Sequence, residues 1–188
     1  MNLTVNHFTP EVESADANCG PTVLAALLGV NTDRAIADMD KHYKNGWHGY
    51  SNVGHIRAAL VANDIKMEKI RLDPEMKRSM AIEGLELNTH YLCFIIIDGP
   101  WTEKGWRSQY NHTHWALFYK GRVMDINNCG LPSYKDDCRV PWTSVQEWRD
   151  EVVPGIIAWD EGTGWSIRSI YKITDKEDWH GFYSGRIL

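Results

Sequence analysis

Apolar residues occur along the chain in short runs, each bounded by residues that end a helix or a strand. Val23–Leu28 follows a proline at position 21 and stops at Gly29, which predicts a helix from about Cys19 to Leu28. This helix is apolar on nearly every face, as expected for a helix at the centre of a domain. Tyr91–Ile97 is a continuous apolar run with three isoleucines, which is typical of a central strand.

The rest of the pattern places helices first and strands afterwards. Further helices are expected at Asp33–Lys41 with Thr32 as the cap, at Asn52–Ala62, from Asp73 to near Gly84, and from Thr143 or Ser144 to about Glu151. Further strands are expected at Ile65–Arg71, His114–Tyr119, Arg122–Ile126, Gly155–Trp159 and Trp165–Ile173. Residues 1–17, 98–111 and 127–141 have an irregular pattern. This order predicts one α+β domain over residues 1–188, because parallel βαβ units would alternate helices with strands.

Composition and charge exclude several function classes. With 43% apolar residues in 188, the chain can bury a core, and its net charge of −5 without a long basic block argues against nucleic-acid binding. No apolar run approaches the ~20 residues of a membrane helix, and Met1–His7 lacks the basic and apolar segments of a signal peptide. We therefore expect a cytoplasmic protein with no membrane contact, no cofactor and reduced cysteines.

Cys19 is the strongest candidate for a reactive side chain. It opens the apolar helix, where the first-turn N–H groups are unpaired and the helix dipole stabilises a thiolate. Far downstream, His114 opens a predicted strand and Asp125 lies near the end of the next one, across a turn at Lys120-Gly121. A cysteine, a histidine and a carboxylate are the parts of a thiol hydrolase.

These motifs resemble those of papain-like cysteine peptidases. The run Asn-Cys-Gly-Pro-Thr at 18–22, a His-aromatic-aliphatic strand at 114–118 and an aspartate eleven residues after the histidine are most similar to bacteriocin-leader-processing, peptidase C39-like proteins. The resemblance covers residues 13–130 and leaves 131–188 as a C-terminal helix and strand extension. It implies a papain-like fold, in which a buried helix carrying Cys19 packs against an antiparallel sheet.

The resemblance also implies a role for each site residue. Cys19 would attack a carbonyl, His114 would take and return the proton, and Asp125 would orient the imidazole. The Cys19 backbone N–H would bind the oxyanion. Papain-like enzymes usually add a glutamine about six residues before the cysteine, but this chain has Glu13 there, whose charge would repel an oxyanion. Asn18 would donate instead, or Glu13 would be protonated.

Several alternatives stay open at these positions. His112 lies two residues before His114 on the same predicted strand face and competes with it as the base. A two-residue turn pairs Tyr119 with Arg122 and sets His114 opposite position 127, so Asn127 or Asn128 competes with Asp125 unless a bulge or twist shifts the register. Trp115 is a candidate substrate contact.

The remaining cysteines give a weaker signal. Cys129 and Cys138 would form one disulfide if oxidised, and Cys93 has the pattern of a buried strand residue. A zinc site from His112, His114 and these two cysteines matches no strong ligand spacing, so no metal is expected.

Three functions follow from these features. The first is a cysteine hydrolase that cleaves a peptide or isopeptide bond of a peptide or protein substrate. The second, motivated by Glu13 and by nine tryptophans and eight tyrosines, is a weakly active or inactive papain-like module that binds an assembly partner, for example in a virion or secretion complex. The third is a cell-wall peptide amidase or endopeptidase, against which the Cys-Gly-Pro motif argues.

Overall fold

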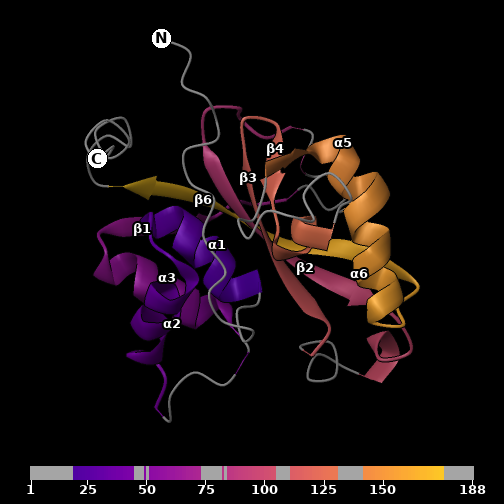
Figure 1. The fold of residues 1–188 in the computed structure, drawn as a ribbon, viewed down its shortest axis with the longest axis horizontal. Coiled ribbons are helices and arrows are strands. Elements are labelled where there is room, and N and C mark those ends of the chain that lie inside the picture. The colour runs from indigo at the N-terminus through magenta and orange to yellow at the C-terminus, as the bar shows by residue number, and fades with distance from the viewer. Residues whose placement is uncertain are drawn as a thin grey trace.

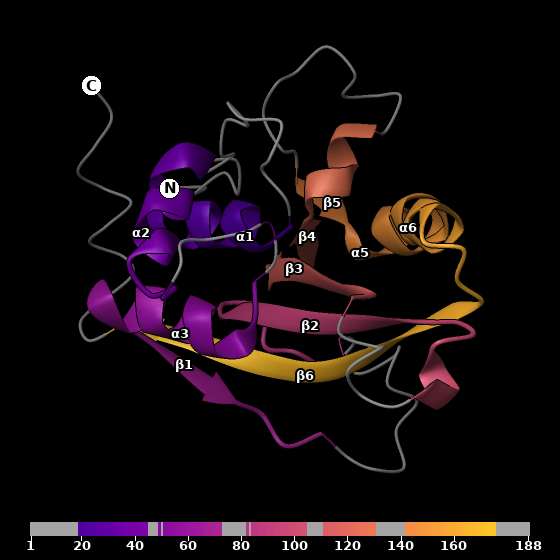
Figure 2. The ribbon, with the colours of Figure 1, turned by 90° about the horizontal axis from the view of Figure 1, so that it is seen from below.

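The computed structural model describes residues 19–44, 49, 51–72, 82, 84–104, 111–130 and 142–175. In these residues three helices come first, and a six-stranded antiparallel sheet follows with a second helical segment before its last strand, which confirms the predicted α+β class. The strands are β1 (Ile65–Lys69), β2 (His90–Asp98), β3 (Thr113–Tyr119), β4 (Arg122–Met124), β5 (Trp142–Ser144) and β6 (Gly164–Asp175), in the spatial order β1-β6-β2-β3-β4-β5. The two longest, β2 and β6, run side by side (Figure 2). The predicted arm at 1–17 and most of the predicted helix at 73–84 lie outside the described residues.

Two groups of helices cover the sheet. The first group contains α1 (Cys19–Leu28), α2 (Thr32–Asp40) and α3 (Val53–Ala62); the second contains α5 (Val145–Glu147), the π-helical turn η6 (Trp148–Val152) and α6 (Val153–Trp159). Figure 1 shows the two groups on opposite sides of β3 and β4. Short 3₁₀ turns, η3 (Thr102–Lys104) and η4 (Ile126–Gly130), lie between strands. No helix in the described part of the chain is long and apolar enough to cross a membrane.

Side chains of β2 alternate between two apolar cores. Leu92 and Phe94 pack in the core formed with α1–α3, whereas Tyr91, Cys93 and Ile95 pack in the core formed with η6 and α6. Because successive strand residues point to opposite faces, a strand buried on both sides is apolar throughout, as the sequence pattern of β2 predicts.

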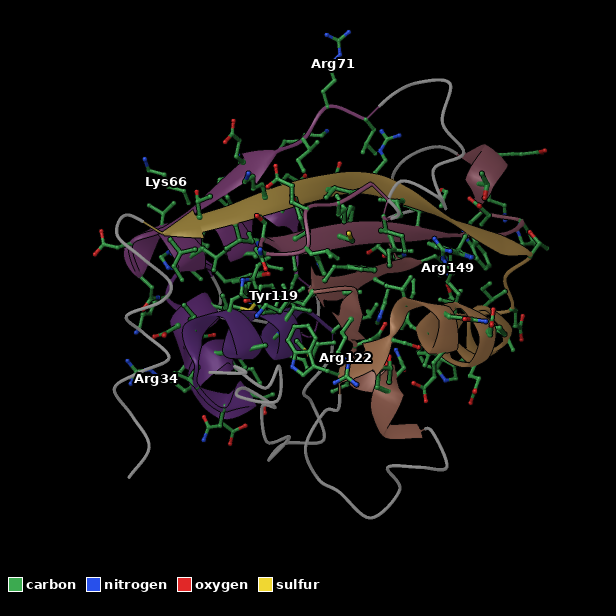
Figure 3. The ribbon with its side chains drawn as sticks, turned by 90° about the horizontal axis from the view of Figure 1, so that it is seen from above. Arg34, Lys66, Arg71, Tyr119, Arg122 and Arg149 are labelled. Atoms are coloured by element: carbon green, nitrogen blue, oxygen red, sulfur yellow. The ribbon has the colours of Figure 1, made fainter. Side chains whose placement is uncertain are left out.

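The β3–β4 hairpin turns where the sequence predicts. Lys120 and Gly121 have φ angles of 51° and 70°, and two left-handed residues in a row match the twist of the flanking strands. Tyr119 pairs with Arg122, and the two side chains lie close together at the end of the hairpin (Figure 3). This turn brings the chain back beside β3 and toward His114.

Three sequence predictions for the elements are wrong. Gly155–Trp159 is not a strand but the end of a helical segment that starts at Val145 and is capped by Ser144, whose Oγ accepts from the Glu147 N–H at 3.1 Å. A five-residue apolar run has no periodicity that separates strand from helix, and the cap upstream decides it. Asn31, rather than Thr32, caps α2. Strand β5 occupies residues 142–144, where a helix cap at Thr143 or Ser144 but no strand is expected.

Burial of His90 predicts a loss of stability in acid. Burial lowers the pKa of His90 from 6.5 to about 4, and the nearby Lys120 ammonium acts in the same direction. Between about pH 4 and pH 6.5, the unfolded chain therefore binds a proton at His90 while the folded chain does not. The free energy of unfolding thus decreases as the pH falls through this range. The His90 ring stacks on Tyr119 with centroids 3.9 Å apart, and a phenylalanine at this position keeps an aromatic ring that does not titrate.

We expect the stability that is lost from pH 7 to pH 4.5 to be about 2–3 kcal/mol smaller in His90→Phe than in the unaltered protein. Urea unfolding at both pH values measures the difference. Equal losses in the two proteins would contradict the prediction.

Candidate active site

His114 and Asp125 form a buried pair. His114 lies on β3 opposite Ile95, and Asp125 follows the last residue of β4. His114 Nε2 and Asp125 Oδ2 are 2.8 Å apart, with side chains 9% and 0% exposed. Because an ionised carboxylate only accepts hydrogen bonds, Nε2 carries a proton and donates it to Asp125.

Strand β4 ends at Met124, and the turn that follows places the Asp125 carboxylate next to His114. Asp125 Oδ1 accepts from the backbone N–H of Asn127 at 2.9 Å and from Asn127 Nδ2 at 3.0 Å, while its backbone carbonyl accepts from the Asn128 N–H at 3.0 Å. These bonds start the 3₁₀ turn η4, so the β3–β4 ladder ends at Leu117 and Met124.

The predicted pairing of His114 with position 127 is therefore corrected. Asn127 donates to Asp125, and it is Asp125 that meets His114. The side chain of Asn128 is also engaged elsewhere, since its Nδ2 donates to the Val123 carbonyl at 3.1 Å. Local hydrogen bonding of an aspartate to the backbone two residues on is a common way to end a strand in a turn.

Cys19 reaches this pair from a third element. It is the first residue of α1, it is half-buried, and it forms no disulfide. Its thiol lies near enough to the His114 ring that its charge and a hydrogen bond contribute to raising the pKa of that ring. Since His114 Nε2 is bound to Asp125, the nitrogen that remains for the sulfur is Nδ1. The three side chains thus contact each other in series.

The electrostatics of the pair favour charge on both members. Burial acts to lower the pKa of His114, but the charges of Asp125 and Cys19 and their hydrogen bonds raise it well above its ordinary value. Burial acts to raise the pKa of Asp125, but the charge and hydrogen bond of His114 outweigh it and lower that pKa. These interactions favour the imidazolium form of His114 and the carboxylate form of Asp125.

Trp148 is a member of the cluster that sequence reasoning missed. Its Nε1–H donates to Asp125 Oδ2 at 2.8 Å, and the residue is completely buried. Its helix begins 20 residues after Asp125 in the chain, at Val145, and nothing in the local pattern links the two.

His112, the alternative base, is engaged at a different place. Its Nδ1 lies 2.9 Å from Asp160 Oδ2 next to α6, and its ring stacks on Trp101 with centroids 3.5 Å apart. β3 begins at Thr113, one residue later. The described residues thus contain two His–Asp pairs, and Cys19 interacts with His114.

Trp115 is a core residue, which corrects its expected contact with substrate. It is 1% exposed, its Nε1–H donates to the Ser51 carbonyl at 2.9 Å, and its ring packs against Phe94 and Tyr171. A side chain enclosed in this way has no surface to offer a ligand.

Other candidate residues lie beyond what the structure describes. They are Glu13, Asn18, Cys138 and the side chain of Cys129. Within the described ranges no group of three or more metal-ligating side chains occurs. Cys93 is a free thiol buried in β2, and burial raises its pKa.

Comparisons with known proteins give one solved structure. A scan against protein-family models finds no match, and a search of curated proteins finds none. A search of solved structures finds the peptidase domain of Streptococcus ComA, a bi-functional ABC transporter involved in a quorum-sensing pathway. The two chains are 20% identical over 87% of this chain and 95% of that domain, with a TM-score of 0.36. A similarity of this size does not assign this chain to a family.

Proposed function

We propose that the chain is a papain-like cysteine hydrolase that cleaves a peptide or isopeptide bond with Cys19, His114 and Asp125. The observation that carries this proposal is the serial contact of a helix-start thiol, an imidazole and a buried carboxylate. Cys19 comes from a helix far upstream of the β3–β4 hairpin that supplies His114 and leads into Asp125. An arrangement of nucleophile, base and orienting group in hydrogen-bond reach is the signature of an activated nucleophile.

The proposed reaction starts from the Cys19 thiolate and the His114 imidazolium. The sulfur attacks the scissile carbonyl carbon, a C–S bond forms, and the carbonyl electrons move to the oxygen. As the tetrahedral adduct collapses, the C–N bond breaks and His114 gives its proton to the leaving amine. A water then attacks the thioester with His114 as the base, which releases the acid and the free thiol.

Asp125 orients the imidazole of His114 for this proton transfer. Its hydrogen bond to Nε2 leaves Nδ1 facing the sulfur and stabilises the imidazolium. The oxyanion needs donors of its own, and the backbone N–H of Cys19 is one candidate because the first-turn N–H groups of a helix have no intrahelical acceptor. We propose Asn18, the residue before the nucleophile, as the second donor in place of the usual glutamine.

A peptide library tests the proposal without knowledge of the substrate. The protein is incubated with peptides from a proteome digest, and new termini are mapped by mass spectrometry. We expect cleavage that falls by about 10³-fold or more in Cys19→Ser, because the hydroxyl lacks the reactivity of a thiolate in this setting. Cys93→Ser is the matched control, since this thiol is 0% exposed.

Two results would contradict the hydrolase. Cleavage that persists in Cys19→Ser would assign the activity to other residues or to a contaminant. Absence of cleavage together with ordinary reactivity of Cys19 toward iodoacetamide would favour the inactive module that binds an assembly partner.

A further inference from the structure

Trp148 contacts the one carboxylate oxygen that also contacts the imidazole. Its indole Nε1 and His114 Nε2 both lie 2.8 Å from Asp125 Oδ2. Asn127 supplies the two donors to the other oxygen, Oδ1. Asp125 therefore has two donors on each oxygen, and rotation of its carboxylate would break bonds on both sides.

Two aromatic rings pack against the indole of Trp148. The Trp148 ring lies nearly perpendicular to the rings of Phe118 and Trp165. Both centroid distances are 5.4 Å, and the interplanar angles are 84° and 85°. Perpendicular aromatic contacts of this kind are favourable. The residue is 0% exposed, so its donor would be costly to leave unpaired.

The local geometry of the helix explains how Trp148 gets there. η6 is a π turn, in which the Val153 N–H donates to the Trp148 carbonyl five residues back. Pro154 follows directly, and because proline has no N–H and its ring would collide with the carbonyl four residues earlier, the wider turn relieves the clash. The result is that Trp148, Val152 and Val153 are all buried.

Resting on the proposed function, we infer that Trp148 is a positioning residue of this active site: its indole N–H holds the Asp125 carboxylate in the orientation that presents Oδ2 to His114. It acts through Asp125 and does not contact the reacting atoms. Electrostatics agree with this role. Burial raises the pKa of Asp125. The charge and hydrogen bond of His114 lower this pKa, and the hydrogen bond from Trp148 lowers it further, which favours the charged carboxylate.

The test removes the N–H and keeps the shape of the ring. Trp148 is replaced by β-(3-benzothienyl)alanine, in which sulfur takes the place of the indole N–H, and in parallel by Trp148→Phe. Trp165→Phe is the matched control, because it changes the same aromatic cluster and leaves the Trp148 N–H that donates to Asp125 in place. The readout is the exchange rate of the His114 Nε2 proton with water, measured by NMR at pH 6.

We expect exchange to be about 10-fold faster or more in both Trp148 variants, since a hydrogen bond to a charged group is worth about 1.5–3 kcal/mol. Trp165→Phe should exchange at the rate of the unaltered protein. An unchanged rate in the benzothienyl variant, or an equal increase in Trp165→Phe, would overturn the inference. If Trp148→Phe fails to fold, the benzothienyl variant decides alone.

Hydrolysis of the peptide library, measured on the same proteins, separates the two proposals. If the unaltered protein cleaves no peptide but exchange of the His114 proton is faster in the Trp148 variants, the hydrolase proposal fails. The effect of Trp148 on the His114–Asp125 pair is then upheld. If the protein cleaves peptides and proton exchange does not respond, positioning by Trp148 fails alone. In an active enzyme, positioning further predicts a lower kcat with little change in KM, because the misplaced imidazole affects proton transfer rather than substrate binding.

Discussion

His114→Ala is expected to slow the alkylation of Cys19 by iodoacetamide about 10- to 100-fold at pH 6.5. Only the thiolate reacts, and in the structure the His114 ring interacts with the sulfur by charge and by a hydrogen bond. Burial acts to lower the pKa of His114, but Asp125 and Cys19 raise it well above its ordinary value of 6.5, which favours the positive ring at this pH. Without that positive charge, an ordinary thiol is about 1% ionised at pH 6.5. Mass spectrometry of the labelled peptides over time gives the rate.

His112→Ala is the matched control for this experiment. Its ring is paired with Asp160 and stacked on Trp101, so its removal should leave the alkylation rate of Cys19 unchanged. Cys93, which is 0% exposed, should remain unlabelled in every folded variant. Equal rates in the unaltered protein and in His114→Ala would show that the imidazole does not activate the thiol.

Asp125→Ala is expected to lower the free energy of unfolding by about 3–5 kcal/mol at pH 7. The carboxylate accepts from His114, Trp148 and Asn127, and its loss leaves the buried indole N–H of Trp148 and the imidazolium without their acceptor. Each unpaired buried donor costs about 1–3 kcal/mol, and more when charged. Urea denaturation measures the change.

The second His–Asp pair provides the control for stability. Asp160 lies 2.9 Å from His112, but the two side chains are 17% and 25% exposed, so solvent replaces the lost acceptor. We expect Asp160→Ala to cost no more than about 1 kcal/mol. Similar losses in Asp125→Ala and Asp160→Ala would contradict a special contribution from the buried network.

The pH dependence of the Asp125 contribution has a definite sign. The folded-state pKa of Asp125 is lower than the ordinary 3.8, so its stabilising effect is present above pH 3.8 and is lost as the pH falls through the lower folded value. The difference between the unaltered protein and Asp125→Ala should therefore shrink in strong acid.

Local signals in the sequence were enough for the elements that carry the proposed site. The proline and glycine around the apolar run marked the helix at 19–28, and Lys120-Gly121 marked the hairpin turn. These signals act over a few residues, because caps and left-handed turn positions depend on neighbouring backbone groups. Gly155–Trp159 failed as a prediction for the same reason: its five residues carry no local signal that separates a helix from a strand.

The sequence by itself determined that Cys19 starts a helix and that His114 and Asp125 lie on either side of one tight hairpin turn. Only the tertiary structure decided that His114 rather than His112 meets Cys19, that Asp125 rather than Asn127 meets His114, and that Trp148 joins them. The physical reason is that these choices depend on where the strand ends, how η4 turns and which residue of a distant helix is buried. The contacts that Cys19 and Trp148 make with this pair join elements far apart in the chain, and no short-range pattern encodes them.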